Sequence, residues 1–220
     1  MRILPRRFAP ALLHPRLCAR FAAAAVGLLA AASPASATTK GLNQIVTPDL
    51  QPAGLLSVSF QAEHPAIGNS LQLQLELGIT RNLEVALFQG FKPGHFTAGV
   101  EYGLMQKPSF LLSTGFLGPW TGDDLQPFVE AGYLREREYF ILGVIRVENN
   151  DQALLGWAHR LTPRLSLALD YQGGGDNFAT AGFTYKFTPT LQLNPALYIS
   201  NSSPHHMFGY AVLTWNVQAW

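Results

Sequence analysis

The chain is poor in cysteine. Its one cysteine, Cys18, lies within the first 37 residues, so residues 38–220 cannot form a disulfide with one another. Small exported domains that cannot build a large core usually depend on such disulfides. The part of the chain after residue 37 is therefore outside the disulfide-stapled class.

Residues 38–220 also lack a cluster of basic side chains. Five arginines and no acidic residue fall within residues 1–37, which leaves ten basic and fourteen acidic residues, a net of −4, for the rest of the chain. Binding to nucleic acid depends largely on neutralising phosphates. Nucleic acid is therefore not an expected partner.

A long apolar run is the third feature that is missing. After residue 37 no run approaches the roughly 18 apolar residues expected of a membrane-spanning helix. If this part of the chain crosses a membrane, it must do so as the strands of a closed barrel, which satisfies every backbone hydrogen bond within the wall.

Residues 1–37 have the pattern of a cleavable signal peptide. A basic stretch runs to Arg20, an apolar run covers residues 21–32, and small residues follow up to Ala37. As a helix, that apolar run would rise only about 18 Å, against roughly 30 Å of hydrocarbon. A retained transmembrane anchor is the alternative. We expect cleavage after Ala37 and export to the outer membrane of a Gram-negative bacterium.

Alternation of apolar and polar residues dominates the chain after residue 54. Leu71, Leu73, Leu75 and Leu77 would lie on one face of a strand, whereas a helix would scatter them around its axis. The same pattern recurs in about twelve segments: 55–62, 70–78, 83–91, 96–105, 110–117, 127–134, 138–147, 153–161, 165–172, 178–187, 191–200 and 207–219. Their lengths suit tilted strands that cross a bilayer.

The connections between these segments favour a transmembrane barrel over a soluble sandwich. Short turns such as 79–82 and 188–190 follow even segments, and more open loops such as 63–69, 118–126 and 201–206 follow odd ones. Short periplasmic turns and longer outer loops are typical of outer-membrane barrels. We predict an all-β, antiparallel transmembrane barrel over residues 55–220, preceded by a periplasmic or plug-like segment over residues 38–54. A periplasmic sandwich or lipocalin-like barrel is the alternative.

Residues 47–91 resemble the opening of a known family. Thr47-Pro48-Asp49 and Pro52-Ala53-Gly54 precede the first strand, and the second ends in Leu77-Gly78-Ile79-Thr80-Arg81-Asn82-Leu83-Glu84-Val85. This is similar to the outer-membrane barrels of the phenol-degradation meta-pathway transporter family. The resemblance implies a porin-like role in the uptake of hydrophobic or aromatic compounds, and it brings no catalytic residues.

The alternation also predicts which side chains line the lumen. The charged ones expected there are Glu76, Glu84, Glu101, Glu130, Arg146, Arg160, Asp170 and Lys186. Charges of both signs can line a wet pore, or they can pair across a filled interior.

An apolar sector of the same inner wall is expected in segments five to eight. Its members are Leu111, Phe140, Leu142, Val144 and Leu154. One hypothesis is that this sector contacts a hydrophobic solute. The alternative is that it packs against the N-terminal segment 38–54 inside the barrel.

Three functions remain open from the sequence. The first is a channel or binder for small solutes, with outer-membrane lipid around it and the barrel-insertion machinery as a partner during biogenesis. The second is a structural or surface-interaction barrel with a filled lumen. The third is a lipid-modifying enzyme, which needs a nucleophile, a base and an orienting group within reach of one another. We predict no catalytic residues, no metal and no cofactor.

Overall fold

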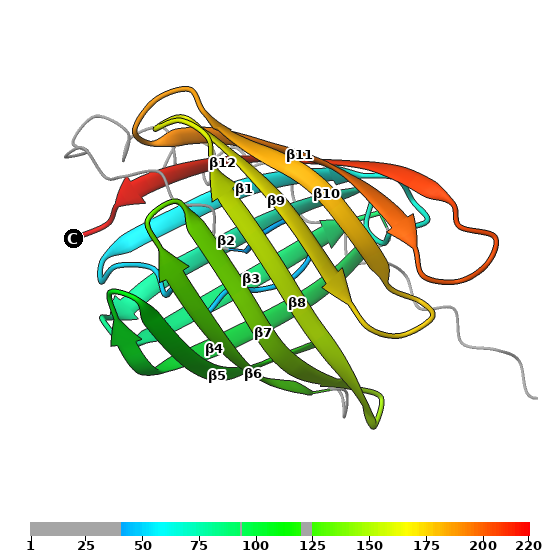
Figure 1. Cartoon of the computed structure of the whole chain (residues 1–220), viewed down its shortest axis with the longest axis horizontal. Helices are drawn as coiled ribbons and strands as arrows, with labels where there is room; N and C mark the ends of the chain where they lie inside the picture. Colours follow the sequence, from blue (N-terminus) through cyan, green and yellow to red (C-terminus); the bar gives the residue numbers. More distant parts are fainter. Residues whose placement is uncertain (1–40, 93, 120–124) are drawn as a thin grey trace, which may run out of the picture. The chain divides into compact units, whose positions relative to one another are not determined.

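Twelve antiparallel strands close into a barrel in the computed structural model, which describes residues 41–92, 94–119 and 125–220 (Figure 1). The strands are β1 (Leu55–Glu63), β2 (Leu71–Thr80), β3 (Leu83–Phe91), β4 (Gly94–Lys107), β5 (Phe110–Pro119), β6 (Gln126–Arg135), β7 (Glu138–Val147), β8 (Asn150–Arg160), β9 (Leu165–Gln172), β10 (Phe178–Lys186), β11 (Leu191–Ser200) and β12 (Met207–Gln218). Each strand pairs with its sequence neighbours, and β1 pairs with β12 to complete the ring. The predicted twelve-stranded antiparallel barrel is confirmed.

The predicted signal peptide, residues 1–37, lies outside the described residues, as do residues 38–40 of the predicted N-terminal segment. Among the residues that are described, no helix is long and apolar enough to cross a membrane.

The two ends of the barrel differ in their connections. At the end where β1 begins and β12 finishes, here called the turn end, each connection has only two or four residues. The opposite end, here called the loop end, carries the longer connections 64–70, 173–177 and 201–206. Two loop-end connections are shorter than expected, because β3 and β4, like β7 and β8, are separated by only two residues. β7 and β8 are joined by Glu148 and Asn149 alone, whose φ angles of 49° and 66° are typical of a tight hairpin turn.

Polar side chains fill the inside of the wall and apolar side chains cover the outside. Along β11, Gln192 and Asn194 are at most 1% exposed, whereas Leu197 is 49% exposed. Other strands repeat this, with Glu130 buried and Val129 exposed on β6. This arrangement is the reverse of a soluble barrel with a dry core, and it is the pattern of a wall that has lipid outside.

Aromatic side chains form a row across the outer face near the turn end. Phe110 is the register partner of Tyr133, Tyr133 that of Phe140, and Phe140 that of Trp157. The first three of these side chains are 40–50% exposed. Directly opposed residues on neighbouring strands have their side chains on the same face, so β5 to β8 carry one continuous aromatic row. Such rows are typical of the level where a membrane meets water.

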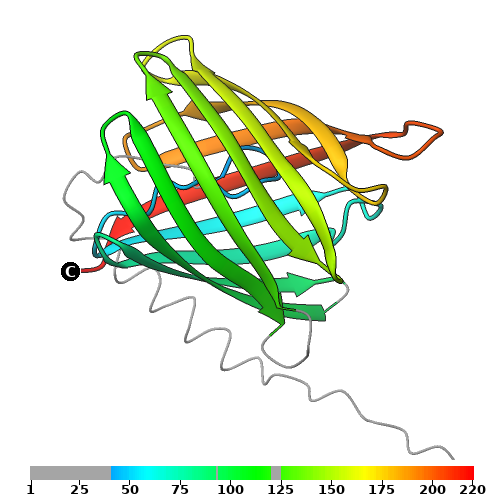
Figure 2. The same cartoon turned by 60° about the horizontal axis from the view of Figure 1, so that its bottom comes forward.

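A segment that precedes the first strand lies within the barrel. Residues 41–54, here called the inner segment, run from the middle of the interior to the turn end and then enter β1 (Figures 1 and 2, blue). Ile45 is 2% exposed and packs in a cluster with Phe128, Ile141, Ile145 and Leu154. The inner segment therefore covers the apolar part of the inner wall.

Two wall glycines make room for the inner segment. A Cβ atom at Gly156 on β8 would lie 2.7 Å from Leu42 Cδ1 and 2.9 Å from Ile45 Cδ1. At Gly182 on β10 it would collide with Asn43 Oδ1. Interiors are close-packed, so any side chain at either position would displace the inner segment or the wall.

Candidate functional site

The part of the inner segment that lies farther from the turn end, around Asn43 and Gln44, is held by one polar cluster on β9, β10 and β11. Asp170 Oδ2 accepts hydrogen bonds from the backbone N–H groups of Asn43 (2.6 Å) and Gln44 (3.0 Å). Its Oδ1 accepts one from Thr180 Oγ1 at 2.6 Å. Asp170 is only 4% exposed, and a buried carboxylate needs such donors. Asp170 thus anchors the segment to the wall.

Asn43 is the partner residue on the segment. Its Nδ2 donates to Thr180 Oγ1 (2.9 Å) and to the backbone oxygen of Ala168 (3.1 Å). Its backbone oxygen accepts a 2.5 Å hydrogen bond from Tyr198 Oη, and its Oδ1 accepts one from Asn194 Nδ2 at 3.2 Å. Asn43 is therefore hydrogen-bonded to three strands, β9, β10 and β11.

The part of the inner segment around Asp49 to Ala53 is bonded to the wall near the turn end. The backbone N–H of Gln51 donates to Glu84 Oε2 at 2.7 Å, and its side-chain Nε2 donates to Ser57 Oγ at 2.7 Å. Tyr139 Oη donates to Asp49 Oδ1 at 3.0 Å. The parallel bridge between Ala53 and Gly78 completes the attachment. The segment is thus bonded to the wall along its whole length.

A cavity of about 450 Å³ lies between the inner segment and the loop end. Residues 41–46 form one side of it, and β1, β2, β12 and β9–β11 supply most of the rest. Its volume falls within the usual range of pockets for small ligands, about 300–1,000 Å³. This cavity is the candidate site.

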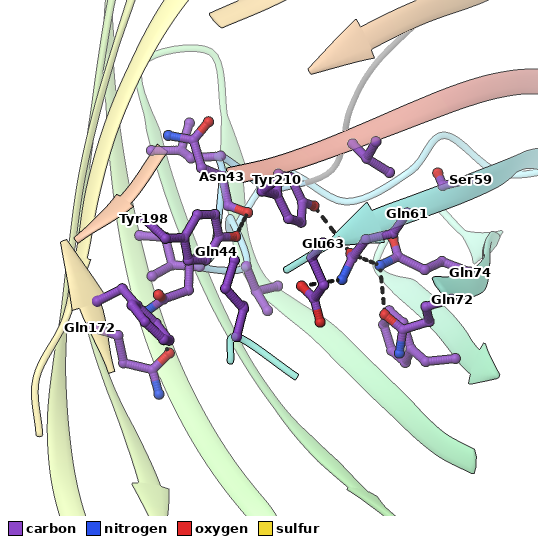
Figure 3. A pocket seen from close by; sticks show the side chains of 18 of the residues that line it. Asn43, Gln44, Ser59, Gln61, Glu63, Gln72, Gln74, Gln172, Tyr198 and Tyr210 are labelled. Carbon is purple, nitrogen blue, oxygen red and sulfur yellow. Dashed lines mark hydrogen bonds between the residues drawn. The ribbon is translucent and has the colours of Figure 1, made fainter. Parts of the chain in front are cut away.

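Side-chain amides are the commonest polar groups of the cavity wall, where apolar side chains are also present, and most of these amides belong to two networks (Figure 3). In the first, Gln74 Nε2 donates to Gln61 Oε1 (2.5 Å) and to Gln72 Oε1 (3.1 Å), while Gln61 Nε2 donates to Glu63 Oε2 at 2.9 Å. Tyr210 Oη also donates to Gln61 Oε1, at 3.2 Å. This network joins β1, β2 and β12.

The second network faces the first from the other side of the cavity (Figure 3). Gln44 Nε2 donates to Gln172 Oε1 at 3.3 Å, and Gln172 Nε2 donates to Gln152 Oε1 at 2.7 Å. Asn177 Nδ2 donates to the same Gln152 oxygen at 3.0 Å. Gln44 comes from the inner segment, so that segment contributes a polar group to the cavity as well as closing it.

The charges that line the cavity are of one sign. Its acidic residues are Glu63, Glu76 and Asp176, and the described lining residues include no lysine, arginine or histidine. Aromatic rings stand beside the amides, because Tyr198 and Tyr210 have ring centroids 5.1 Å apart and Phe178 packs edge-on to Tyr198. The wall therefore offers amide donors and acceptors, aromatic surface and a mild negative charge.

The sequence-predicted lumen acids lie on the inner face of the wall. Glu84, Glu101, Glu130 and Asp170 are at most 4% exposed, and Glu76 lines the cavity. Lys186 ends β10 in the same phase as buried Thr180. Arg160 ends β8 in the phase of buried Leu154, and its Nη2 donates to the backbone oxygen of Glu136 at the turn end.

The sequence prediction of which β7 side chains face the lumen is wrong. Phe140, Leu142 and Val144 are 45%, 63% and 43% exposed, and they lie on the outer face. Both faces of β7 are apolar, so the prediction of its inner face rested only on the expectation that Arg146 points inward. Arg146 instead lies on the outer face near the loop end, where its Nε donates to Asp151 Oδ1 at 2.7 Å.

An apolar inner sector nevertheless exists on β5 to β8. Leu111 and Leu154 belong to the inner face, at 8% and 2% exposed, and Ile141 and Ile145 replace the three outward residues of β7. The inner segment covers the Leu154 part of this sector through Ile45. This contact corresponds to packing against the N-terminal segment, the alternative to a hydrophobic solute.

Four cavity residues were not predicted as site residues: Asn43, Gln44, Tyr198 and Tyr210. The inner segment has no strand periodicity, so alternation gave no signal for Asn43 and Gln44. Tyr198 shares a face with buried Asn194, and Tyr210 shares one with buried Asn216. Alternation could therefore have placed both tyrosines inside the barrel, but it could not show that they meet at one cavity.

Among the described residues the histidines lie at both ends of the barrel, and His64 and His206 both contact the ring of Phe208 near the loop end. His159 lies on the outer face, where its Nδ1 meets Glu138 Oε1 at 2.5 Å and its ring stacks on Trp157. His64, His95, His205 and His206 lie toward the loop end. Within the described residues no group of three or more His, Cys, Asp or Glu side chains could hold a metal ion.

Comparison with solved structures identifies similar barrels. The NanC porin matches with a TM-score of 0.51 at 9% identity, over 75% of this chain and 100% of that one. The KdgM porin matches with a TM-score of 0.54 at 11% identity, over 72% and 98%. A KdgM complex with disordered oligogalacturonate gives a TM-score of 0.53 at 11% identity, over 73% and 98%. At these sequence identities the similarity shows a common fold alone.

A scan against protein-family models finds no match, and a search of curated proteins finds none either. The resemblance of residues 47–91 to the phenol-degradation meta-pathway family stays a prediction.

Proposed function

We propose that this chain is an outer-membrane barrel of a Gram-negative bacterium that admits a small solute to the loop-end cavity and passes it inward when the inner segment moves. The observation that carries the membrane location is the inverted wall. Leu142 is 63% exposed in the middle of a strand, while Glu130 and Asn216 are at most 1% exposed. Removing such an apolar surface from water favours insertion by about 25 cal/mol for each Å².

The polar cavity supports the transport part of the proposal. It contains hydrogen-bonding groups from five strands or more, and it is bounded toward the turn end by a segment that is not part of the wall. Two porins are among the solved structures with a similar fold. In this reading the outer leaflet surrounds the loop end, and the turn end faces the periplasm.

A barrel with a permanently filled interior is the second candidate. The close fit of Ile45 against Gly156 and the multiple hydrogen bonds of Asn43 favour it. Its function would then reside in the outer loops. An enzyme is less well supported. Thr97 Oγ1 and His95 Nε2 are 2.7 Å apart, but among the described residues no carboxylate contacts the His95 ring to orient it. His159 meets a carboxylate and an indole, and no described hydroxyl group hydrogen-bonds its ring.

A disulfide tether separates the first two candidates. Residues 38–220 contain no cysteine, and Asn43 lies where a side chain at Gly182 would point. We expect an N43C/G182C variant, refolded without residues 1–37, to lose discrete openings in planar bilayers when oxidised. Openings should return after reduction. The N43C and G182C single variants control for the loss of each native residue.

Two results would contradict the proposal. A barrel that never opens, with or without the tether, has a filled interior and belongs to the second candidate. A refolded chain that stays dissolved without detergent, and that migrates identically in gels before and after boiling, is not a membrane barrel.

A further inference from the structure

The loop-end cavity carries more chemistry than a passive opening needs. Six of its lining side chains are glutamine or asparagine amides from wall strands or wall connections: Gln61, Gln72, Gln74, Gln126, Gln172 and Asn177. An amide both donates and accepts hydrogen bonds and carries no charge. A wall of this kind suits a ligand that does the same.

We propose that this cavity binds an uncharged, polyhydroxylated solute of the size of a small oligosaccharide. The proposal rests on the proposed function and names its solute class. Each hydroxyl of such a solute is a donor and an acceptor, so it can replace one partner in an amide network without leaving a buried group unsatisfied.

The hydrogen-bonding capacity of the amide side chains supports this class. A primary amide has two N–H donors and an oxygen with two lone pairs. Within their networks the side chain of Gln72 makes one hydrogen bond and that of Gln172 makes two, so both amides can also bind a solute. The two amide networks stand on opposite sides of the space, where one extended solute can reach both (Figure 3).

The aromatic side chains fit the same class. Tyr198 and Tyr210 are stacked at a tilt of 36° and supply apolar ring surface next to hydrogen-bonding groups. An aromatic face beside polar groups suits a ligand with C–H faces and hydroxyl edges. A purely aromatic solute would displace water from these polar side chains without replacing the hydrogen bonds that the water makes.

The charge of the wall argues against acidic solutes. Acidic side chains line the cavity, Asp176 among them, and the described lining residues include no lysine, arginine or histidine. Like charges repel. An oligogalacturonate, which carries one carboxylate per sugar, would meet this repulsion, whereas a neutral oligosaccharide would not.

Calorimetric titration of the refolded chain tests the solute class directly. The detergent should be lauryldimethylamine oxide, which has no sugar headgroup, and the probes should be maltotriose, trigalacturonate, 1-naphthol and spermidine. We expect saturable binding of maltotriose and at least tenfold weaker binding of trigalacturonate and 1-naphthol. Spermidine, which acidic side chains attract, tests whether charge alone accounts for binding, and we expect it to bind more weakly than maltotriose because it has no hydroxyl groups. Tighter binding of any of these three, or no saturable binding of maltotriose, would overturn the proposal.

A double substitution ties the binding to the site. Gln61→Leu with Gln74→Leu removes the centre of the first amide network, and we expect it to weaken maltotriose binding at least tenfold. Gln89→Leu is the matched control. Gln89 lies on β3 with its side chain out of phase with the cavity-lining Phe88, so this variant should bind as the parent does. Equal binding by the double variant and the parent would overturn the assignment.

The fold and the proposed function are checked on the same samples. Migration before and after boiling reports whether each variant is a folded barrel, and planar-bilayer recording reports whether it opens. A variant that is folded and conducts but does not bind maltotriose supports the site. A parent chain that conducts and does not bind it defeats the solute class and leaves the channel proposal standing.

Discussion

The backbone N–H of Asn43 donates a 2.6 Å hydrogen bond to Oδ2 of Asp170, although the two residues are 127 positions apart. This contact joins the inner segment to the barrel wall at the level where the cavity begins. Asp170 also binds Thr180 Oγ1 and the N–H of Gln44. One carboxylate thus joins β9 and β10 to the inner segment, and its loss should loosen that attachment.

Replacing Asp170 with asparagine should free the part of the inner segment around Asn43 and Gln44. The amide oxygen can still accept from the two N–H groups, but it carries no charge, and the amide NH₂ cannot accept the hydrogen bond that Thr180 Oγ1 donates. Hydrogen bonds to a charged group contribute roughly 1.5–3 kcal/mol, which is about tenfold or more in the opening equilibrium. Hydrogen exchange measured by mass spectrometry should therefore be at least tenfold faster at residues 43 and 44.

Asp176→Asn is the matched control for that measurement. Asp176 is exposed in the connection between β9 and β10, so its substitution should leave exchange at residues 43 and 44 unchanged. Unaltered exchange in the Asp170 variant would mean that the segment is held by other contacts.

A side chain at Gly156 should destabilise the packed interior. In Gly156→Leu the new atoms would enter the space of Leu42 and Ile45. Overpacking of this kind costs about 1–3 kcal/mol. On gels of samples heated to increasing temperatures, the folded barrel and the unfolded chain give separate bands. We expect the folded band to convert to the unfolded band at a lower temperature in this variant.

Gly209→Leu provides the comparison. Gly209 is exposed on β12, and a Cβ atom there would meet nothing within 4 Å. The same substitution should therefore leave the conversion temperature unchanged. If Gly156→Leu were equally harmless, the inner segment would not occupy the space beside β8.

The barrel could be predicted from the sequence because alternation is a strong signal over many strands. The four leucines of β2 and the buried acids Glu84, Glu101 and Glu130 follow from it, since one face of each strand is clearly more polar. A period of two fixes which residues share a face. The polarity of the two faces then indicates which face is inside.

The same signal fails where both faces are apolar. On β7 the buried side chains are Ile141 and Ile145, and the exposed ones include Leu142 and Val144. These residue types do not show which face of β7 is inside. Arg146 misleads the prediction, because it pairs with Asp151 on the outer surface. The inner segment explains why the inner face is apolar there: Ile45 packs against it, a contact between distant parts of the chain that no local pattern encodes.

The phase of β7 can be measured with single cysteines. Residues 38–220 have none of their own, so Leu142→Cys and Ile141→Cys can each carry one fluorescent label in vesicles. Leu142 is 63% exposed on the outer face, and Ile141 is 4% exposed on the inner face. We expect lipids brominated near the chain ends to quench the label at residue 142 strongly and the label at residue 141 weakly.

A charge at the same two positions gives an independent measurement of the phase. Arginine on the lipid face of a barrel costs about 2–4 kcal/mol near the bilayer midplane, so Leu142→Arg should lower the folded fraction in a urea titration in vesicles. Leu142→Ser is the control, because it removes the leucine without adding a charge, and it should lower the folded fraction less. Equal quenching at residues 141 and 142, together with no difference between the arginine and serine variants, would show that the outer side of β7 is not in contact with lipid.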